Sequence, residues 1–283
     1  MSYVFLTAGS AVFLALYDLF KKISVRDKKD IYEILFFYTL IAFLCSLFFI
    51  NSAFSISLKY ILFILIKSFL ISLSWFLTMK AMSKLDLGIV VPFSMLGTVS
   101  TTILAWVFFG ETIGVAQIGG ILVILVGLFL ISRISRKNDN EVNDYKYLWL
   151  LALAAFLTSI SAILDKYLLD DIGRGSVLFW FFLFLAFIYL IICFIKNKKI
   201  VLNNFTNNLW VIGIGVSIFL SDLLYYSAVS IGDGNLSIIS IIRKLSVFIG
   251  LVLASIFLKE KYFVKKLLVM LLMFVGLSFI IFI

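Results

Sequence analysis

The chain has 283 residues, of which 64% are hydrophobic and 14% are charged, and its mean hydropathy is +1.19. So little polar surface excludes a soluble domain and predicts an integral membrane protein. In such a protein the formal net charge of +9 reports which side of the membrane the loops face, so it predicts no nucleic-acid partner. The chain has no histidine and both cysteines lie in apolar runs, so the sequence predicts no metal, no cofactor and no disulfide.

Ten segments are apolar enough to cross a bilayer, which needs roughly 20 residues in a helix. They are 3–20, 31–50, 60–80, 87–109, 113–132, 147–168, 176–195, 208–230, 235–258 and 264–283. The single proline, Pro92, lies inside the fourth segment, where it predicts a kink. Only 133–146 and 196–207 are long or polar enough to be linkers, so the sequence predicts an all-α membrane protein with ten transmembrane helices.

The loops between these segments differ in charge from one face to the other. Ten spans place both termini on one face, whose loops hold only Lys59 and Arg174 among the basic residues. Most of the 24 Lys and Arg residues fall in the loops of the opposite face. Because such loops stay cytoplasmic, the distribution predicts a bacterial-type inner (plasma) membrane protein with both termini on the outer face.

The chain contains an internal repeat. Residues 72–82 (SLSWFLTMKAM) align with 219–229 (FLSDLLYYSAV), and 104–113 (LAWVFFGETI) align with 253–262 (LASIFLKEKY) after a two-residue insertion. The alignment predicts two five-helix repeats, 1–133 and 146–283, joined by a linker at 134–145. Since five is odd, the second repeat enters the membrane upside down. Inverted repeats are typical of alternating-access transporters that bind substrate near the midplane, although a non-transporting membrane scaffold grown by duplication is the alternative.

Each repeat has an apolar fourth span that runs into a turn containing glutamate, Gly110-Glu111 in the first repeat and Lys259-Glu260 in the second. With the segment 243–261 (RKLSVFIGLVLASIFLKEK), this arrangement resembles the EamA-type family of the drug/metabolite transporter superfamily. The resemblance implies transport of small polar solutes through a cavity lined by spans one to four and six to nine, with spans five and ten peripheral. It also implies an acidic residue where this chain has Arg243, and in many members both termini in the cytoplasm.

Two adjacent cations, Arg243 and Lys244, lie near the middle of the ninth span, where a charge needs a partner or a water-filled cavity. Asp222 and Arg243 lie about ten residues on either side of the predicted turn at 232–233, so they should meet across the antiparallel hairpin of spans eight and nine. Neighbouring helical residues point about 100° apart, so Lys244 should face elsewhere. The alternatives are that the pair only holds the hairpin together, and that Lys244 snorkels or finds carbonyl oxygens.

Other charged residues are expected in the same half of the membrane, namely Lys67 in the third span and Asp165 and Lys166 at the end of the sixth. Counted with the ninth-span cations and Asp222, they predict an interior with about two positive charges in excess. An unmatched buried cation favours an anionic group on the solute, which predicts a carboxylate or phosphate. Alternatively, Lys67 lies nearer the interface and Asp165–Lys166 is an ordinary helix end.

The two repeats share a scaffold but differ in charge, since Trp75 aligns with Asp222 and Ser94 with Arg243. Aromatic side chains from both repeats are expected to form walls of the site or, alternatively, to serve as packing and interface anchors. The predicted substrate-binding residues are Tyr17, Lys67, Trp75, Ser94, Asp222, Tyr225, Tyr226, Arg243 and Lys244, with Asp222 also able to carry a coupling proton.

Residues outside that set have structural interpretations. Glu111 and Glu260 are expected to cap the tight turns at the start of the fifth and tenth spans, where a carboxylate is favourable in a first turn. Gly119, Gly120 and Gly127 in the fifth span permit close helix packing.

Other function classes fit the sequence less well. An enzyme is not expected, because there is no histidine and the buried acids Asp18, Asp165 and Asp222 are far apart in sequence. A channel would need rings of like residues or a filter loop, and neither is apparent. The predicted partners are a small-molecule solute, the lipid bilayer and a second copy of the chain, joined through the peripheral spans. A flippase for a lipid-linked headgroup that contains phosphate is the alternative within transport.

Overall fold

The computed structural model describes residues 2–26, 30–109, 112–136, 144–196, 209–231 and 236–282. These residues form helices joined by turns, with no strand among them. Ten helical stretches are long and apolar enough to cross a membrane, as predicted. Glu111, most of the predicted linker and the predicted turn at 232–233 lie outside the described residues.

The ten spans consist of the following elements. They are α1 (Ser2–Arg26), then α2 (Ile31–Ser46) with η1 (Leu47–Phe49) and α3 (Ile50–Ala53), α4 (Leu58–Met82), α5 (Leu87–Val90) with η2 (Val91–Ser94) and α6 (Met95–Phe109), α7 (Val115–Arg136), α8 (Asp144–Asp171), α9 (Arg174–Ile195), α11 (Leu209–Ser230), α12 (Leu236–Leu258) and α13 (Phe263–Phe282).

The fourth span is interrupted at the proline. Pro92 has no backbone N–H to donate and lies in the 3₁₀ segment η2, between α5 and α6. The α-helical hydrogen bonding is therefore interrupted where the kink was predicted, which divides the span into a short first part and a longer second part. As shown below, residues of the interruption line the central cavity.

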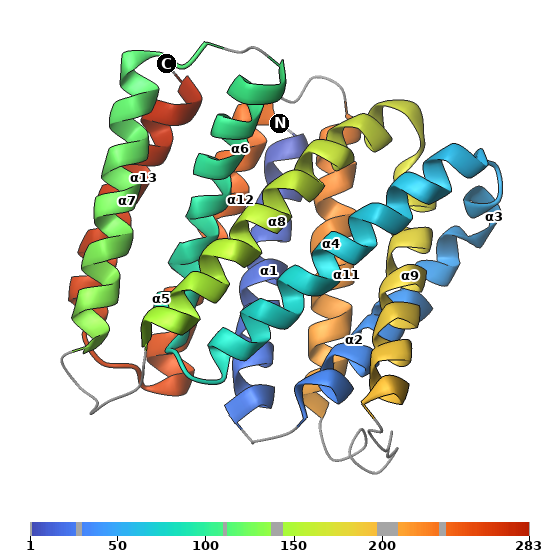
Figure 1. Cartoon of the computed structure of the whole chain (residues 1–283), viewed down its shortest axis with the longest axis horizontal. Coiled ribbons are helices and arrows are strands. Elements are labelled where there is room, and N and C mark those ends of the chain that lie inside the picture. The colour runs from blue at the N-terminus through green and yellow to red at the C-terminus, as the bar shows by residue number, and fades with distance from the viewer. Residues whose placement is uncertain are drawn as a thin grey trace.

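The two repeats run in opposite directions through the bundle (Figure 1). Helix α1 descends from the face that carries both termini, whereas α8, which begins the second repeat, rises toward that face. The termini share one face, and the described ends of α1, α4 and α9 that carry Arg26, Lys80 and Lys196 lie on the opposite face. The fold is thus all-α, with ten spans arranged as two inverted five-helix repeats.

The repeats are interlocked rather than side by side. Helix α1 packs against α11, and its repeat counterpart α8 packs against α4, the counterpart of α11. Helix α2 packs against α9, and α7 against α13. Ser10 and Ser221 join α1 to α11 reciprocally, because each hydroxyl donates to the other's carbonyl oxygen, at 2.8 and 3.1 Å. Each repeat therefore buries much of its apolar surface against the other.

Helices α7 and α13 form a separate pair at one end of the bundle, so spans five and ten are peripheral (Figure 1). A Cβ on Gly120 would overlap the Gly276 carbonyl oxygen, and a Cβ on Gly127 would overlap Met273, whereas one on Gly119 would meet nothing within 4 Å. Two of the three fifth-span glycines therefore serve packing within the chain. A homodimer through these spans stays a prediction, and it would have to use their outer faces, which expose Leu122 and Leu268.

The turn between the ninth and tenth spans differs from its prediction. Helix α13 begins at Phe263, so Glu260 precedes it and does not cap it. The Glu260 carboxylate instead accepts hydrogen bonds from the backbone N–H groups of Leu87 and Gly88, in the other repeat. The prediction that Glu260 caps a helix start was correct, but the helix is α5 rather than α13. Packing between the repeats decides which backbone N–H groups lie nearest to the carboxylate.

Candidate functional site

A cavity of about 430 Å³ lies between the two repeats. Its walls come from α1, α4, the interrupted fourth span, α8, α11 and α12, with Phe181 of α9. All nine predicted substrate-binding residues line it, namely Tyr17, Lys67, Trp75, Ser94, Asp222, Tyr225, Tyr226, Arg243 and Lys244. Their location is thus established by the structure, whereas their role in binding stays a prediction.

The second span departs from the arrangement that the resemblance implies. Among the described residues, α2 contributes no side chain to the cavity wall. It is packed against α9 and α11 instead, and its Tyr38 is fully buried behind Tyr17 and Trp75. Helix α2 therefore supports the aromatic part of the wall from behind.

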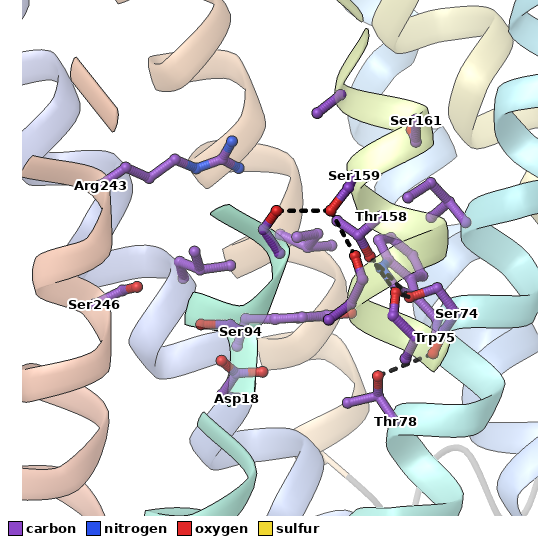
Figure 2. Close-up of a pocket in the computed structure, with 18 of the residues that line it drawn as sticks. Asp18, Ser74, Trp75, Thr78, Ser94, Thr158, Ser159, Ser161, Arg243 and Ser246 are labelled. Atoms are coloured by element: carbon purple, nitrogen blue, oxygen red, sulfur yellow. Dashed lines mark hydrogen bonds between the residues drawn. The ribbon is translucent and has the colours of Figure 1, made fainter. Parts of the chain in front are cut away.

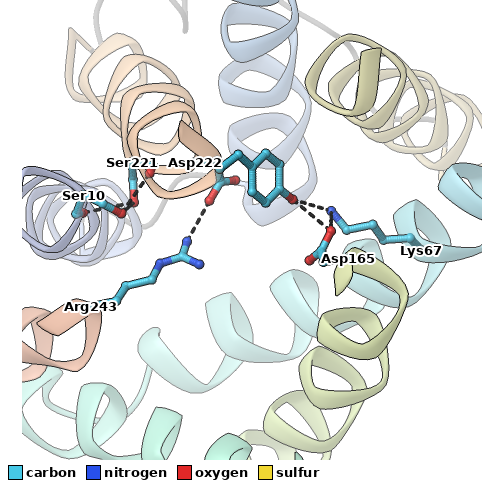
Figure 3. Close-up of polar contacts among 7 residues, drawn as sticks. Ser10, Lys67, Asp165, Ser221, Asp222 and Arg243 are labelled. Carbon is cyan, nitrogen blue, oxygen red and sulfur yellow. Dashed lines mark hydrogen bonds and ion pairs between the residues drawn. The ribbon is translucent and has the colours of Figure 1, made fainter. Parts of the chain in front are cut away.

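Asp222 and Arg243 form the predicted ion pair across the hairpin of α11 and α12 (Figure 3). Arg243 Nη2 lies 2.8 Å from Asp222 Oδ1, and the Arg243 guanidinium lies over the Tyr225 ring, 3.8 Å from its centroid. Equal distance in sequence from the turn thus correctly predicted which residues meet across the hairpin. Arg243 Nε is buried and has no hydrogen-bond partner among the described residues.

A second ion pair lies on the other side of the cavity (Figure 3). Lys67 Nζ is 2.8 Å from Asp165 Oδ1 and donates to the Tyr226 hydroxyl at 2.8 Å, and that hydroxyl in turn donates to Asp165 at 3.0 Å. The Lys67 side chain is only 2% exposed, so it is buried in the protein interior, and its depth in the membrane stays a prediction. Asp165 is not at a helix end, because α8 continues to Asp171, and the Lys166 side chain lies outside the described ones.

Lys244 points away from Arg243, as the helical geometry predicts. Its ammonium group donates to the carbonyl oxygen of Ser94 in η2, at 2.7 Å. This is one of the two alternatives considered for Lys244, in which the cation finds a carbonyl oxygen. Within the described part of the chain, no carboxylate lies within ion-pair distance of Lys244.

The charge count of the cavity corrects the prediction of two excess positive charges. The charged lining residues are Lys67, Arg243 and Lys244 and the acids Asp18, Asp165 and Asp222. These formal charges balance, and Asp18 is further paired with buried Lys21 at 3.6 Å. The predicted sum left out Asp18, which lines the cavity, and it included Lys166, whose side chain lies outside the described ones. The opposite charges are nevertheless not all paired with one another, because Lys244 lines the cavity without a described carboxylate partner.

The aromatic residues of the wall have different surroundings. Trp75 lies 5.8 Å from Tyr17 and 5.5 Å from Tyr38 between ring centroids, which makes a rigid apolar corner. Tyr225 is covered on one face by Arg243, and the Tyr226 hydroxyl is engaged by Lys67 and Asp165. Trp75 and Tyr17 therefore fit the predicted wall, whereas Tyr225 and Tyr226 mainly hold the charged groups.

The sequence reasoning missed a set of hydroxyl groups on the cavity wall (Figure 2). They are Ser74 and Thr78 of α4, Thr98 and Thr101 of α6, Thr158, Ser159 and Ser161 of α8, and Ser246 of α12, beside the predicted Ser94 of η2. Ser74 bonds to the Ala154 carbonyl and Ser159 to the Gly97 carbonyl, at 2.9 and 2.8 Å, so part of the set joins helices. The signal in the sequence is Ser or Thr spaced four apart in apolar spans, as at 74 and 78.

The lining set offers hydrogen bonds and charges rather than metal ligands. Among the described residues no three His, Cys, Asp or Glu side chains lie close enough together to hold a metal ion. The cavity can therefore bind a solute that presents both an apolar surface and polar or charged groups.

Comparison with known proteins agrees with this architecture. A solved structure titled "Crystal structure of protein" superposes with a TM-score of 0.64, at 14% sequence identity, over 96% of this chain and 94% of that one. At this identity the likeness concerns the fold alone. No curated protein sequence matches the chain. The model of the EamA-like transporter family matches residues 1–133 and again residues 145–282. Two matches that together cover nearly the whole chain, on a ten-span inverted repeat with a central cavity, show that the protein belongs to the EamA-like transporter family.

Proposed function

We propose that the protein is a secondary transporter that carries a small polar metabolite bearing a carboxylate or phosphate, by alternating access of the central cavity. The observation that carries this proposal is Lys244, a cation on the cavity wall that contacts a carbonyl oxygen but no described carboxylate. The anionic group of the solute is its counter-ion. The remaining charged lining residues already have partners in the described chain.

The physical argument rests on the cost of an unmatched charge. A central Lys costs about 2.5–3.5 kcal/mol on insertion scales, and a carbonyl oxygen satisfies one hydrogen bond without neutralising the charge. A carboxylate or phosphate supplies short charge-assisted bonds to the same group. The unpartnered Arg243 Nε offers a further donor on the same helix. A volume of about 430 Å³ suits a metabolite rather than a polymer.

The direct test measures solute binding by thermal shift of the purified protein and uptake into proteoliposomes. Amino acids, sugar phosphates and polyprenyl phosphates are offered separately. We expect a stabilising ligand among the first two classes, and we expect Lys244→Ala to weaken its binding by about tenfold or more. Lys265→Ala is the matched control, because Lys265 is exposed outside the cavity. Binding unchanged by Lys244→Ala would remove this residue from the site, and stabilisation by polyprenyl phosphate alone would favour the flippase.

Asp222 is proposed as the group that couples transport to protons. Neutralising its carboxylate removes the charge that holds Arg243, 2.8 Å away, and frees that guanidinium for the solute. Asp222→Asn is therefore expected to abolish accumulation driven by a proton gradient while solute exchange at equal concentrations continues. Accumulation at the wild-type rate would contradict the coupling role without affecting the role of Lys244.

We also propose that the face rich in basic loops is cytoplasmic, which places both termini outside a plasma membrane of the bacterial inner type. The positive-inside rule supports this orientation, since the terminal face has few basic residues in its loops.

A further inference from the structure

Glu260 makes a polar junction between the two repeats on the cation-rich side of the cavity. Its Oε1 accepts a hydrogen bond from Leu87 N at 2.6 Å, and its Oε2 accepts one from Gly88 N at 3.0 Å. Lys266 Nζ lies 2.9 Å from the same Oε2. We call these four residues the inter-repeat cap. The Glu260 side chain is 7% exposed and that of Lys266 1%, and Lys266 Nζ also lies 3.5 Å from Oδ2 of Asp86, whose side chain is 51% exposed.

The cap lies between the cavity and the cation-rich face. Val90 and Met82 line the cavity, and the chain continues from both toward the cap and that face. Leu85 and Leu87 are buried there, and Lys22 donates to the carbonyl oxygens of Met82 and Leu85 at 2.7 and 2.6 Å. Buried side chains and charge-assisted hydrogen bonds therefore lie between the cavity and this face.

Several features make the cap a junction that can open. It joins a turn of one repeat to the first residues of the interrupted span of the other, and Pro92 lies just beyond them. Its bonds are polar, so water can replace them when the surfaces part. Gly88 leaves room for the carboxylate, since a Cβ there would lie 2.8 Å from Glu260 Oε2 and 3.0 Å from Lys266 Cδ. The loss of a few such hydrogen bonds is enough to shift the equilibrium between a conformation with the cap formed and one with the cap broken.

We propose that the inter-repeat cap is the gate on the cation-rich face. The Glu260 carboxylate holds the first turn of the fourth span against the turn before α13 while the cavity is closed to that side, and its release opens the cavity there. This inference rests on alternating access in the proposed function, but it does not depend on the identity of the solute.

The gate is tested by sided chemical labelling, which needs no solute. The reporter is Thr78→Cys, a cavity-lining position about one turn from the cation-rich end of α4, in a chain with Cys45→Ser and Cys193→Ser. A membrane-impermeant maleimide is presented from the cation-rich face of oriented vesicles. We expect slow labelling with the intact cap, and labelling about tenfold faster or more after Glu260→Ala.

Two further variants keep the test decisive. Gly88→Ala retains the carboxylate but displaces it, so it should also speed labelling. Lys265→Ala changes the exposed neighbour of Lys266 and should leave the rate unchanged. Correct folding is checked by monodisperse elution, and Glu260→Gln, which keeps the side-chain shape, replaces Glu260→Ala if the latter fails this check.

The outcomes separate the gate from the proposed solute. Faster labelling in folded Glu260 and Gly88 variants supports the gate even if no anionic solute is ever transported. Unchanged labelling in these variants overturns it, even if Lys244→Ala abolishes uptake.

Discussion

At the residue scale, the site depends on how each buried charge is satisfied. Asp222–Arg243 and Lys67–Asp165 are close pairs on opposite sides of the cavity, and each also contacts a tyrosine, Tyr225 or Tyr226. Pairing of this kind makes removal of one partner costly, because the other charge then remains buried and uncompensated. Lys244 differs because its described partner is neutral.

The pair on the third span gives a prediction about stability. Lys67→Met should lower the free energy of unfolding by about 1–3 kcal/mol, because it leaves Asp165 without its cation. Tyr226→Phe, which keeps the ion pair and removes only the hydroxyl, should cost about 1 kcal/mol. Thermal unfolding in detergent measures both. Lys59→Met, at an exposed lysine of the same helix, should have little effect, and a Lys67 variant as stable as wild type would contradict the account.

The sequence predicted one of these pairs and not the other for a physical reason. Asp222 and Arg243 belong to consecutive spans, so counting from the turn was enough to place them at one depth. Lys67 and Asp165 belong to α4 and α8, in different repeats, and their contact depends on how the repeats pack. The same limit explains Glu260, whose partners Leu87 and Gly88 are far away in sequence.

At the element scale, the peripheral pair α7 and α13 packs closely through glycines of both helices. Gly120 faces Gly276 there, and a Cβ on Gly276 would lie 2.8 Å from the Gly120 carbonyl oxygen. The backbones thus approach without intervening side chains, an arrangement common between membrane helices. Among the described residues, neither helix contributes to the cavity wall.

The two adjacent glycines of α7 make a matched test of this packing. Gly120→Ala should destabilise the protein by about 1–3 kcal/mol, because the new methyl group overlaps the Gly276 carbonyl. Gly119→Ala should be neutral or slightly stabilising, because its methyl group meets nothing within 4 Å and alanine favours helix. Thermal unfolding distinguishes them. Equal effects of the two substitutions would show that the close approach does not limit stability.

Element boundaries and number were largely predictable, because long apolar segments between charged loops determine them. The composition of the second span, by contrast, did not predict that it would be excluded from the cavity wall. Helices α2 and α9 are both strongly apolar, yet only α9 contributes a described residue to the wall. Which apolar helix faces a cavity is decided by packing against its neighbours. The hydroxyl groups at 74, 78 and 158 were the available signal, and they mark the helices that line the cavity.

At the scale of the whole molecule, the inverted arrangement puts the termini on one face and the described basic ends of α1, α4 and α9 on the other. Orientation in the membrane is therefore testable with two exposed positions, Lys59 on the terminal face and Lys84 on the other. In intact cells an impermeant maleimide should label Lys59→Cys and not Lys84→Cys, because the basic face is expected to be cytoplasmic. Labelling of Lys84→Cys alone would reverse the proposed orientation and leave the fold and the cavity unaffected.

The interlocked pairing of α1 with α11 has a consequence for synthesis. The reciprocal bonds between Ser10 and Ser221 join residues that are 211 positions apart. At about 5–20 residues per second, the ribosome needs on the order of 10–40 s to make the second after the first. During that interval α1 must lie in the bilayer with its hydroxyl-bearing face next to lipid or a translocon component. Ser10 therefore lacks the partner that it has in the folded protein until the eighth span is inserted.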